Sequence, residues 1–307
     1  MSIEPIEIVH AKSGARAVVH PYGATVTSYK TSTGREMLFV SRLAKMDATK
    51  AIRGGIPLVF PQFGRPDDSY PQHGFLRCNT WTAAGEVSQD GDEAASADFT
   101  LKLADATNAR GGSVWGLRED GSAAGGVDCT VTLTVRVSPS SLTTTLTVKT
   151  PPESAAFDYQ CLFHSYHSVS GGSALDADSC YVSGLGGYSV EDKVTGESYT
   201  LGDGPITVGG EVDRIYTPPD GKPEVDAIVR TGKDGSSASV KASATQGGSV
   251  VPVSCVVWNP HLEKAKGMGD FGDDQYHNMI CVEPGVLKGG KLGGGEEVVF
   301  TQVITAL

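Results

Sequence analysis

The sequence predicts an all-β fold: a large antiparallel β-sandwich with few short helices. Stretches rich in valine, threonine and aromatic residues alternate between apolar and polar side chains with a period of two. The 39 glycines and 16 prolines cluster with Ser and Asp between these stretches, as expected of a fold with many turns. Many short strands without alternating helices favour a sandwich or barrel over a doubly wound sheet.

The clearest strand patterns recur along the whole chain. In order, they cover residues 24–30, 130–137, 141–150, 255–258 and 296–307. Residues 259–271 predict one short helix, with Asn259 as a candidate N-cap before Pro260. Residues 105–128 are rich in Gly, Ala and Ser and predict an exposed loop, and residues 231–239 predict a hairpin turn. With no internal repeat and no long linker, we expect a single domain spanning residues 1–307.

The composition narrows the possible partners. A formal net charge of −11 argues against a nucleic-acid binder, although a few arginines can still bind a small anion. Apolar runs are too short to span a bilayer, and the acidic N-terminus lacks a signal-peptide pattern. We therefore expect a soluble, cytoplasmic monomer without a membrane partner.

The cysteine pattern predicts neither a zinc ribbon nor a redox site. None of the six cysteines forms a CxxC pair. The even count is compatible with disulfides, but reduced, partly buried thiols that pack as small hydrophobic groups are the expected case. They are Cys78, Cys129, Cys161, Cys180, Cys255 and Cys281.

Polar residues gather in a few segments that also contain glycine, proline and bulky apolar residues. The segments are RGGIPLVFPQFG (53–64), PQHGFLR (71–77), CLFHSYH (161–167), EVDRIY (211–216) and ICVEPG (280–285). An ordinary strand has no need of so many rigid turns beside fixed cations. These segments are therefore the candidates for a functional site.

Glu283 is the candidate base. It follows the apolar run from Met279 to Val282 and precedes Pro-Gly, which places it where a buried strand ends. Partial burial would raise its pKa above about 4.3 and make it a better base near neutral pH. On this segment alone, a carboxylate that accepts turn amides or forms a salt bridge is the more common case.

His164 is the candidate acid. Strand alternation sends the side chains of its neighbours Phe163 and Ser165 to the opposite face of the sheet. A histidine there can donate or accept a proton near pH 7, although a hydrogen-bonded core histidine is commoner. His167, three residues further on, faces the other way in a regular strand. A metal site built on both histidines is therefore disfavoured.

Arg53, Arg65 and Arg77 each adjoin a Gly- or Pro-rich loop. The planar guanidinium suits phosphate, because it makes two parallel charge-assisted hydrogen bonds. In an acidic chain, weak surface ion pairs are a serious alternative. The remaining polar residues of the segments are Gln72, His73 and Asp213. When each is read alone, the more common interpretation is a side chain that satisfies backbone groups of a turn.

Taken together and in this order, the segments resemble the hexose-6-phosphate mutarotases, or glucose-6-phosphate 1-epimerases, of the aldose 1-epimerase superfamily. The segment VVWNPHLEKAKGMGDF (256–271) belongs to the same resemblance. It implies the galactose mutarotase-like supersandwich fold. The chain departs from the family pattern at residues 113–128 and 148–154, outside the segments with candidate catalytic residues.

The resemblance implies a role for each candidate residue. His164 and Glu283 match the catalytic pair, and Arg53 and Arg77 match the arginines that bind the sugar phosphate. The positions that match sugar contacts are Gln72, His73 and Asp213, and Arg65 matches a position that is often basic. The implied partner is a small-molecule sugar phosphate, and the implied chemistry uses no metal and no organic cofactor.

The implied reaction interconverts the α and β anomers of an aldohexose 6-phosphate, with glucose 6-phosphate as the expected substrate. Glu283 as a carboxylate would take the proton of the C1 hydroxyl, and His164, held protonated by Glu283, would protonate the ring oxygen. Two alternatives stay open: a mutarotase of free sugars, and a carbohydrate-binding sandwich without catalysis.

Overall fold

The computed structural model describes residues 4–68, 70–106 and 126–307. Its regular structure is almost wholly β, as the alternating pattern predicted. The described strands are β1 Ile6–Val9, β2 Arg16–His20, β3 Thr25–Lys30, β4 Leu58–Val59, β5 Thr82–Ala83, β6 Ser88–Asp90, β7 Ala94–Lys102, β8 Thr130–Val137, β9 Ser141–Lys149, β10 Phe157–Phe163, β11 Tyr166–Ser168, β12 Tyr181–Ser183, β13 Ser189–Asp192, β14 Ser198–Thr200, β15 Val212–Thr217, β16 Val225–Arg230, β17 Ser237–Gln246, β18 Ser249–Val251, β19 Ser254–Asn259, β20 Met279–Leu292 and β21 Glu297–Ala306. The helices are α1 His261–Lys266 and the 3-10 turns η1 Leu76–Cys78, η2 Leu103–Asp105 and η3 Gln275–Asn278.

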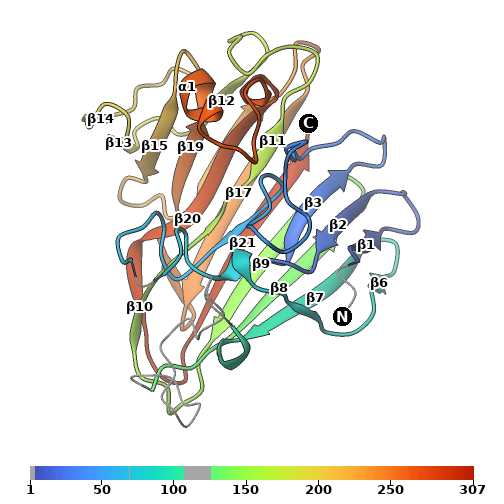
Figure 1. Cartoon of the computed structure of the whole chain (residues 1–307), viewed down its shortest axis with the longest axis vertical. Helices are drawn as coiled ribbons and strands as arrows, with labels where there is room; N and C mark the ends of the chain where they lie inside the picture. The colour runs from blue at the N-terminus through green and yellow to red at the C-terminus, as the bar shows by residue number, and fades with distance from the viewer. Residues whose placement is uncertain (1–3, 69, 107–125) are drawn as a thin grey trace.

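The strands form three antiparallel sheets (Figure 1). The eight-stranded sheet has the order β14-β13-β15-β19-β20-β10-β4, with β11 also paired to β20. The ten-stranded sheet has the order β12-β16-β17-β21-β9-β8-β7-β5, with β18 on β17 and β6 on β7. Strands β1 to β3 form the third sheet, and β1 contacts β7 and β8. The predicted all-β, antiparallel fold is confirmed.

The period-two pattern buries one face of the long strands. In β8, Val131, Leu133, Val135 and Val137 are buried, and the threonines between them are partly exposed. The eight- and ten-stranded sheets pack directly against each other. This packing is seen where Phe163 of β10 stacks on Phe300 of β21, with ring centroids 4.6 Å apart. Apolar burial of this kind stabilises the fold by roughly 25 cal/mol per Å².

Two local predictions can be compared with the structure. The hairpin turn is confirmed, since β16 and β17 pair antiparallel up to Arg230 and Ser237. The helix prediction was one residue early: Pro260 occupies the N-cap, and α1 begins at His261. The Asn259 side chain still accepts the His261 amide hydrogen bond at 2.9 Å, so it caps the helix from one position before the boundary. The predicted loop 105–128 lies largely outside the described residues.

The RGG sequence at residues 53–55 is explained by close backbone packing. Gly54 and Gly55 have φ values of +127° and +68°, which L side chains rarely adopt. A Cβ on Gly54 would lie 2.4 Å from the Cα of Val40, and one on Gly55 would lie 2.1 Å from the carbonyl oxygen of Val26. Only glycine therefore fits, and this packing fixes the backbone beside Arg53.

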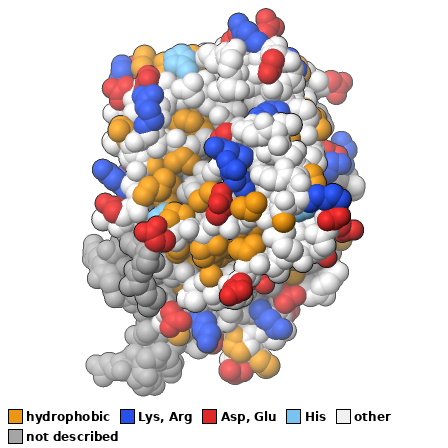
Figure 2. All heavy atoms as spheres, turned by 90° about the vertical axis from the view of Figure 1, so that its right-hand side faces the viewer, with side chains coloured by type: hydrophobic (Ala, Val, Ile, Leu, Met, Phe, Trp, Pro, Cys, Tyr) orange, Lys and Arg blue, Asp and Glu red, His pale blue; other side chains and the backbone are white. Residues whose placement is uncertain are grey.

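All six cysteines are free thiols, five of them buried, as the sequence predicted. Within the described ranges, no helix has the length and apolar character needed to cross a membrane. The face drawn in Figure 2 carries acidic and basic side chains scattered among apolar patches. No continuous basic field is visible on that face.

Candidate active site

A cavity of about 370 Å³ opens at the eight-stranded sheet and brings together most of the predicted site residues. This volume lies within the usual range for small-molecule sites. The predicted residues that line it are Arg53, Gln72, His73, Arg77, His164, Asp213 and Glu283. The lining residues that the sequence analysis did not single out are Phe63, Gly64, Lys193, Val256, Trp258, Lys264 and Met268.

Three neighbouring strands supply the floor of the cavity through their register. Asp213 of β15 lies opposite Trp258 of β19, and Trp258 lies opposite Cys281 of β20. Two residues further along both strands, Val256 of β19 lies opposite Glu283 of β20. Because side chains two apart on a strand share a face, Glu283 and Asp213 reach the same side of the sheet as Trp258 and Val256.

His164 is placed by the end of strand β10. Its amide donates a 3.0 Å hydrogen bond to the Pro57 carbonyl, which fixes the backbone. Phe163 points into the core against Phe300, and the Ser165 hydroxyl donates to Gln302 at 2.8 Å. The neighbours of His164 thus face the core while His164 faces the cavity, as the alternation predicted.

His164 and Glu283 form a buried pair. Nδ1 of His164 lies 3.2 Å from Oε1 of Glu283, and the two side chains are 8% and 1% exposed. The contact is not a hydrogen bond, because Nδ1 of His164 has no hydrogen-bond partner within the described structure, and neither has the other carboxyl oxygen, Oε2 of Glu283. A buried polar atom without a hydrogen-bond partner destabilises the folded protein, so a ligand hydroxyl that donates to Oε2 would be bound favourably.

The environment favours the neutral form of each member of the pair. Burial raises the pKa of Glu283 well above its ordinary value, with a further rise from Asp213 and an opposing effect of Arg77. Burial, Arg77 and Arg53 together lower the pKa of His164 well below its ordinary value. The prediction that Glu283 holds His164 in the charged form disagrees with this lowered pKa of His164. Desolvation and two arginine charges outweigh the attraction of one carboxylate.

Aromatic rings hold the His164 imidazole on two sides. The Tyr166 ring lies parallel to it, with centroids 4.8 Å apart and an interplanar angle of 8°. The Trp258 ring meets it edge-on, with centroids 5.9 Å apart and an angle of 82°. These contacts limit rotation of the imidazole and exclude water from its faces.

His73 presents one defined nitrogen to the cavity. Its Nδ1 accepts the Gly64 amide at 3.1 Å, so in the neutral ring the proton lies on Nε2. Burial, followed by the charges of Arg77 and His164, lowers the pKa of His73 well below its ordinary value. The neutral imidazole can therefore donate a hydrogen bond from Nε2 to a hydroxyl group in the cavity.

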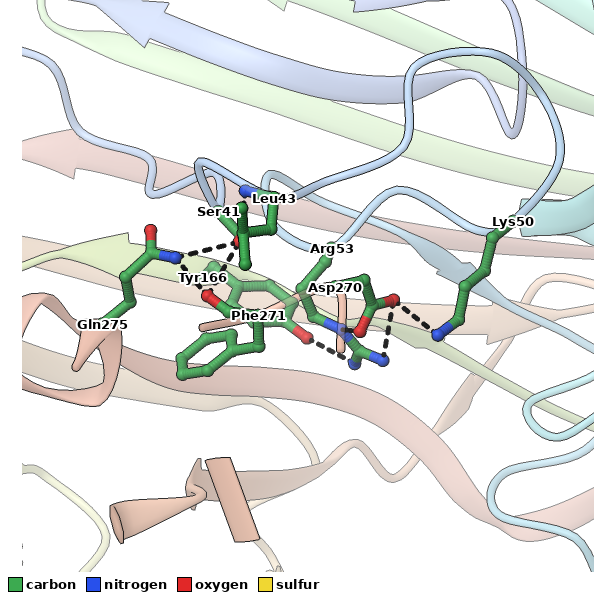
Figure 3. Close-up of polar contacts among 8 residues, drawn as sticks. All are labelled: Ser41, Leu43, Lys50, Arg53, Tyr166, Asp270, Phe271 and Gln275. Atoms are coloured by element: carbon green, nitrogen blue, oxygen red, sulfur yellow. Dashed lines mark hydrogen bonds and ion pairs between the residues drawn. The ribbon is translucent and has the colours of Figure 1, made fainter. Parts of the chain in front are cut away.

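Arg53 is held in place from two directions (Figure 3). Its Nε and Nη2 donate to the two carboxylate oxygens of Asp270 at 3.3 and 3.4 Å, and its Nη1 donates to the Tyr166 hydroxyl at 3.3 Å. Asp270 is 3% exposed and also binds Nζ of Lys50 at 2.9 Å. Burial opposes the charge of Arg53, but Tyr166 and Asp270 outweigh it and raise its pKa.

The segment that carries Asp270 is itself anchored. The Ser41 hydroxyl donates to the Phe271 carbonyl at 2.9 Å, and Gln275 Nε2 donates to the Ser41 oxygen at 3.2 Å (Figure 3). These bonds tie the loop after α1 to the segment before Arg53. The sequence reasoning missed Asp270, although it lies within the segment GMGDF that contributed to the resemblance.

Arg77 lies in η1, and its Nη2 donates to the Gln72 carbonyl at 2.8 Å. Its Nε is buried and has no hydrogen-bond partner among the described atoms. Burial lowers the pKa of Arg77, and the charge of Arg53 lowers it further. An anion beside Arg77 would offset both effects and supply an acceptor for Nε.

Asp213 lies beside a cation that sequence reasoning missed. Lys264 of α1 donates to Asp213 at 3.4 Å and to Glu211 at 2.6 Å. Burial raises the pKa of Asp213, and Lys264 opposes the rise. Lys193 lines the same wall, and its amide donates to the Asp213 carbonyl at 2.8 Å. Asp213 is thus an acceptor available to sugar hydroxyls, held by α1 and β15.

Two residues lie away from the cavity. Arg65 does not line it; its side chain is 61% exposed and pairs with Asp68 at 2.9 Å. His167 is completely buried, and neither ring nitrogen has a hydrogen-bond partner among the described atoms. Burial lowers the pKa of His167 to about 4. The structure therefore separates His167 from His164, as the strand alternation predicted.

Three potential metal ligands also meet at the cavity floor. His164, Cys281 and Glu283 each offer one ligand atom, all within 4.8 Å of one another. Burial raises the pKa of Cys281 and of Glu283 well above their ordinary values. Both groups must lose a proton to bind a cation, so metal binding here would be coupled to proton release.

An antiparallel β protein whose cavity combines a carboxyl–imidazole pair with hydrogen-bonding groups on its rim is suited to acid–base chemistry on a polyhydroxylated ligand. The model of one family, the aldose 1-epimerases, matches residues 6–305. The chain belongs to this family. It is an aldose epimerase, an isomerase that acts on a sugar.

Individual relatives support this membership. The chain is 33% identical over 285 residues to a protein of Cenchrus ciliaris named "Putative glucose-6-phosphate 1-epimerase", covering 90% of this chain and 77% of the relative. A protein of Escherichia coli K12 with the same name is 26% identical over 262 residues, covering 85% of this chain and 76% of that protein.

Solved structures share the fold. A "putative mutarotase" of Salmonella typhimurium superposes with a TM-score of 0.75 at 23% identity, covering 95% of this chain and 87% of that one. A galactose mutarotase-related enzyme of Lactobacillus acidophilus superposes with a TM-score of 0.68 at 14% identity, covering 99% and 97%. The expected galactose mutarotase-like fold is confirmed.

Proposed function

We propose that the protein interconverts the α and β anomers of an aldohexose 6-phosphate, with glucose 6-phosphate as its substrate. One observation carries the proposal: the His164–Glu283 pair, 3.2 Å apart, shares a cavity with two partly buried arginines, and the charge of Arg53 lowers the pKa of Arg77. The pair supplies the acid and the base for ring opening. The arginines supply a subsite for a dianion. The names of the Cenchrus ciliaris and Escherichia coli relatives agree with this substrate.

The reaction requires two proton transfers. Glu283 takes the proton of the C1 hydroxyl while His164 donates a proton to the ring oxygen, and the bond between C1 and O5 breaks to give the open aldehyde. Rotation about the C1–C2 bond presents the other face of the carbonyl. The two residues then return the protons in reverse, so that the enzyme ends in its starting state. Each transfer contributes about 10²-fold or more to the rate.

The substrate phosphate prepares the charge state that these steps need. Arg77 and Arg53 help to lower the pKa of His164. A phosphate dianion bound to both arginines offsets their charge and removes this cause of the shift. His164 can then accept a proton more easily. Because the phosphate also offsets the lowering effect of Arg77 on the pKa of Glu283, ionised Glu283 depends on the attraction of the His164 imidazolium 3.2 Å away. A substrate without the phosphate leaves the pair in its neutral form and should react more slowly.

The remaining groups orient the sugar. His73 offers its Nε2 proton, Asp213 offers a carboxylate held by Lys264, and Trp258 offers an aromatic face. Gln72 is exposed at the mouth of the cavity, where it can contact a hydroxyl group. Binding energy from the phosphate end fixes the ring against the acid–base pair.

A coupled anomerisation assay at low temperature tests the proposal. It compares kcat/KM for glucose 6-phosphate with kcat/KM for glucose, galactose and mannose and for their 6-phosphates. We expect at least a tenfold preference, on the order of one charge-assisted contact, for the phosphorylated form. A ratio near one would replace the proposal with a free-sugar mutarotase. Sugar binding without turnover of any substrate would replace it with a carbohydrate-binding protein.

A further inference from the structure

A second cavity adjoins the candidate active site. It has a volume of about 620 Å³, and we call it the outer cavity. It shares Arg53, Gln72 and Arg77 with the first cavity, so these residues stand between the two. Its other lining residues include Lys50 and Thr49, and no carboxylate lies among the described residues that line it. In a chain with a net charge of −11, a cavity lined by three cations and no acid is unusual.

The charges around the outer cavity can be counted. Lys50, Arg53 and Arg77 contribute three positive charges. Two carboxylates outside the lining oppose them: Asp270, which binds Lys50 and Arg53, and Asp47, which accepts hydrogen bonds from Thr49. The formal sum is therefore +1. A phosphate monoester carries about −1.5 to −2 at pH 7. Without Lys50 the sum is zero, so the attraction for the second charge of a dianion is weaker.

We propose that Lys50 is the third cation of the phosphate subsite, and that it makes the enzyme select a dianionic phosphate ester over a monoanionic ester of the same shape. This inference rests on the proposed function. The phosphate binds between Arg53 and Arg77 and faces the outer cavity, where the Lys50 ammonium approaches it. Lys50 is 53% exposed, so its side chain is free to turn from Asp270 toward an incoming anion.

Lys50 could instead act indirectly, by holding Asp270 in the position that fixes Arg53. The two roles differ in what they discriminate. A direct contact is stronger for a dianion than for a monoanion, because the interaction energy scales with the ligand charge. A positioning role acts only through Arg53, so its effect on the phosphate-to-sulfate ratio disappears in an Arg53→Ala background, whereas the effect of a direct contact persists there.

The test compares glucose 6-phosphate with glucose 6-sulfate, a permanent monoanion of nearly the same shape. We measure kcat/KM for both substrates at pH 7.5 in wild type, Lys50→Met and Lys50→Arg, and in Arg53→Ala with and without Lys50→Met. Lys45→Met is the matched control, because Lys45 lies in the same loop, is exposed and does not line the outer cavity. Glucose serves as the uncharged reference substrate in each variant.

Wild type should prefer the phosphate. Lys50→Met should lower the phosphate-to-sulfate ratio about two- to fivefold, the range for a partly exposed charge contact. Lys50→Arg should keep the ratio, and Lys45→Met should leave it unchanged. An unchanged ratio in Lys50→Met, or a decrease that occurs only while Arg53 is present, overturns the assignment of Lys50. If wild type does not distinguish glucose 6-phosphate from glucose, the proposed function fails, whatever the Lys50 variants do.

Discussion

The Tyr166 ring lies parallel to the His164 ring, 4.8 Å away, and the Tyr166 hydroxyl accepts a 3.3 Å hydrogen bond from Arg53. One side chain thus contacts both the proposed acid and the proposed phosphate ligand. The phosphate end of the cavity and its reacting end are therefore mechanically connected. Movement of Arg53 toward a ligand would shift the Tyr166 ring, and the ring would in turn shift the His164 imidazole that stacks on it.

This connection predicts different outcomes for two substitutions of Tyr166. Tyr166→Phe removes the acceptor for Arg53 but keeps the ring against His164. We expect KM for glucose 6-phosphate to rise about three- to tenfold, the effect of one lost hydrogen bond, with kcat on glucose retained. Tyr166→Leu also removes the stacked ring and should lower kcat for both substrates. Equal kinetics in the two variants would show that the ring contact contributes nothing.

Substitution of Glu283 tests the proposed base. Glu283→Gln keeps the shape of the side chain but cannot accept a proton, so kcat should fall at least about a hundredfold. Sugar phosphate binding, measured by calorimetry, should be largely retained. The control is Glu86→Gln, an exposed glutamate outside the cavity. If Glu283→Gln keeps most of its turnover, another residue is the base.

The phosphate subsite predicts that its arginines matter only for phosphorylated sugars. Arg53→Ala and Arg77→Ala should each lower the ratio of kcat/KM for glucose 6-phosphate over glucose about tenfold or more, mainly through KM. Arg65→Ala, an exposed arginine outside the cavity, is the control and should leave the ratio unchanged. A loss of equal size on both sugars would mean that the two arginines only support the fold.

Buried His167 predicts a loss of stability in acid. The unfolded chain protonates this residue below about pH 6.5, whereas burial lowers its pKa in the folded protein to about 4. Between these values the unfolded state binds more protons, so the free energy of unfolding falls as the pH falls. The full effect is about 3 kcal/mol.

Urea unfolding of wild type and His167→Gln at pH 7.5 and pH 4.5 measures this effect. The decrease in free energy of unfolding between the two pH values should be smaller in His167→Gln. His73 and His164, whose pKa values are also lowered, contribute in the same direction and cancel in the comparison. His261→Gln, at a partly exposed position, serves as the control. An identical decrease in wild type and His167→Gln would refute the prediction.

The tight packing at Gly55 predicts a folding defect. Gly55→Ala combines an unfavourable positive φ with a Cβ 2.1 Å from a carbonyl oxygen, so we expect a loss of at least about 2 kcal/mol in the free energy of unfolding. Gly34→Ala has a similar φ of +84° but no atom within 4 Å of the new Cβ, and should lose only about 1 kcal/mol. Similar losses in both variants would show that the close approach is not limiting.

Much of the site could be predicted because its residues lie in short segments with distinctive chemistry. Residues 53–77 and 161–167 and Glu283 stood out from a Val- and Thr-rich background, and their side chains do meet in one cavity. Arg65 was included through its position after Phe63-Gly64, yet it points to solvent and Asp68. A single residue's direction on an irregular loop is not encoded in a periodic pattern. The single domain, the monomeric state and the cytoplasmic location stay predictions.

The sequence by itself determined the class of fold, the segments that hold the chemistry and the opposite orientations of His164 and His167, because a period of two is a local property of the backbone. Only the tertiary structure decided which groups act on one another. Asp270 reaches Arg53 across 217 positions of sequence, and the combined burial of His164 and Glu283 sets their charge states. Desolvation and charge interactions depend on distances in space, which the packing of the folded chain fixes and no local pattern specifies.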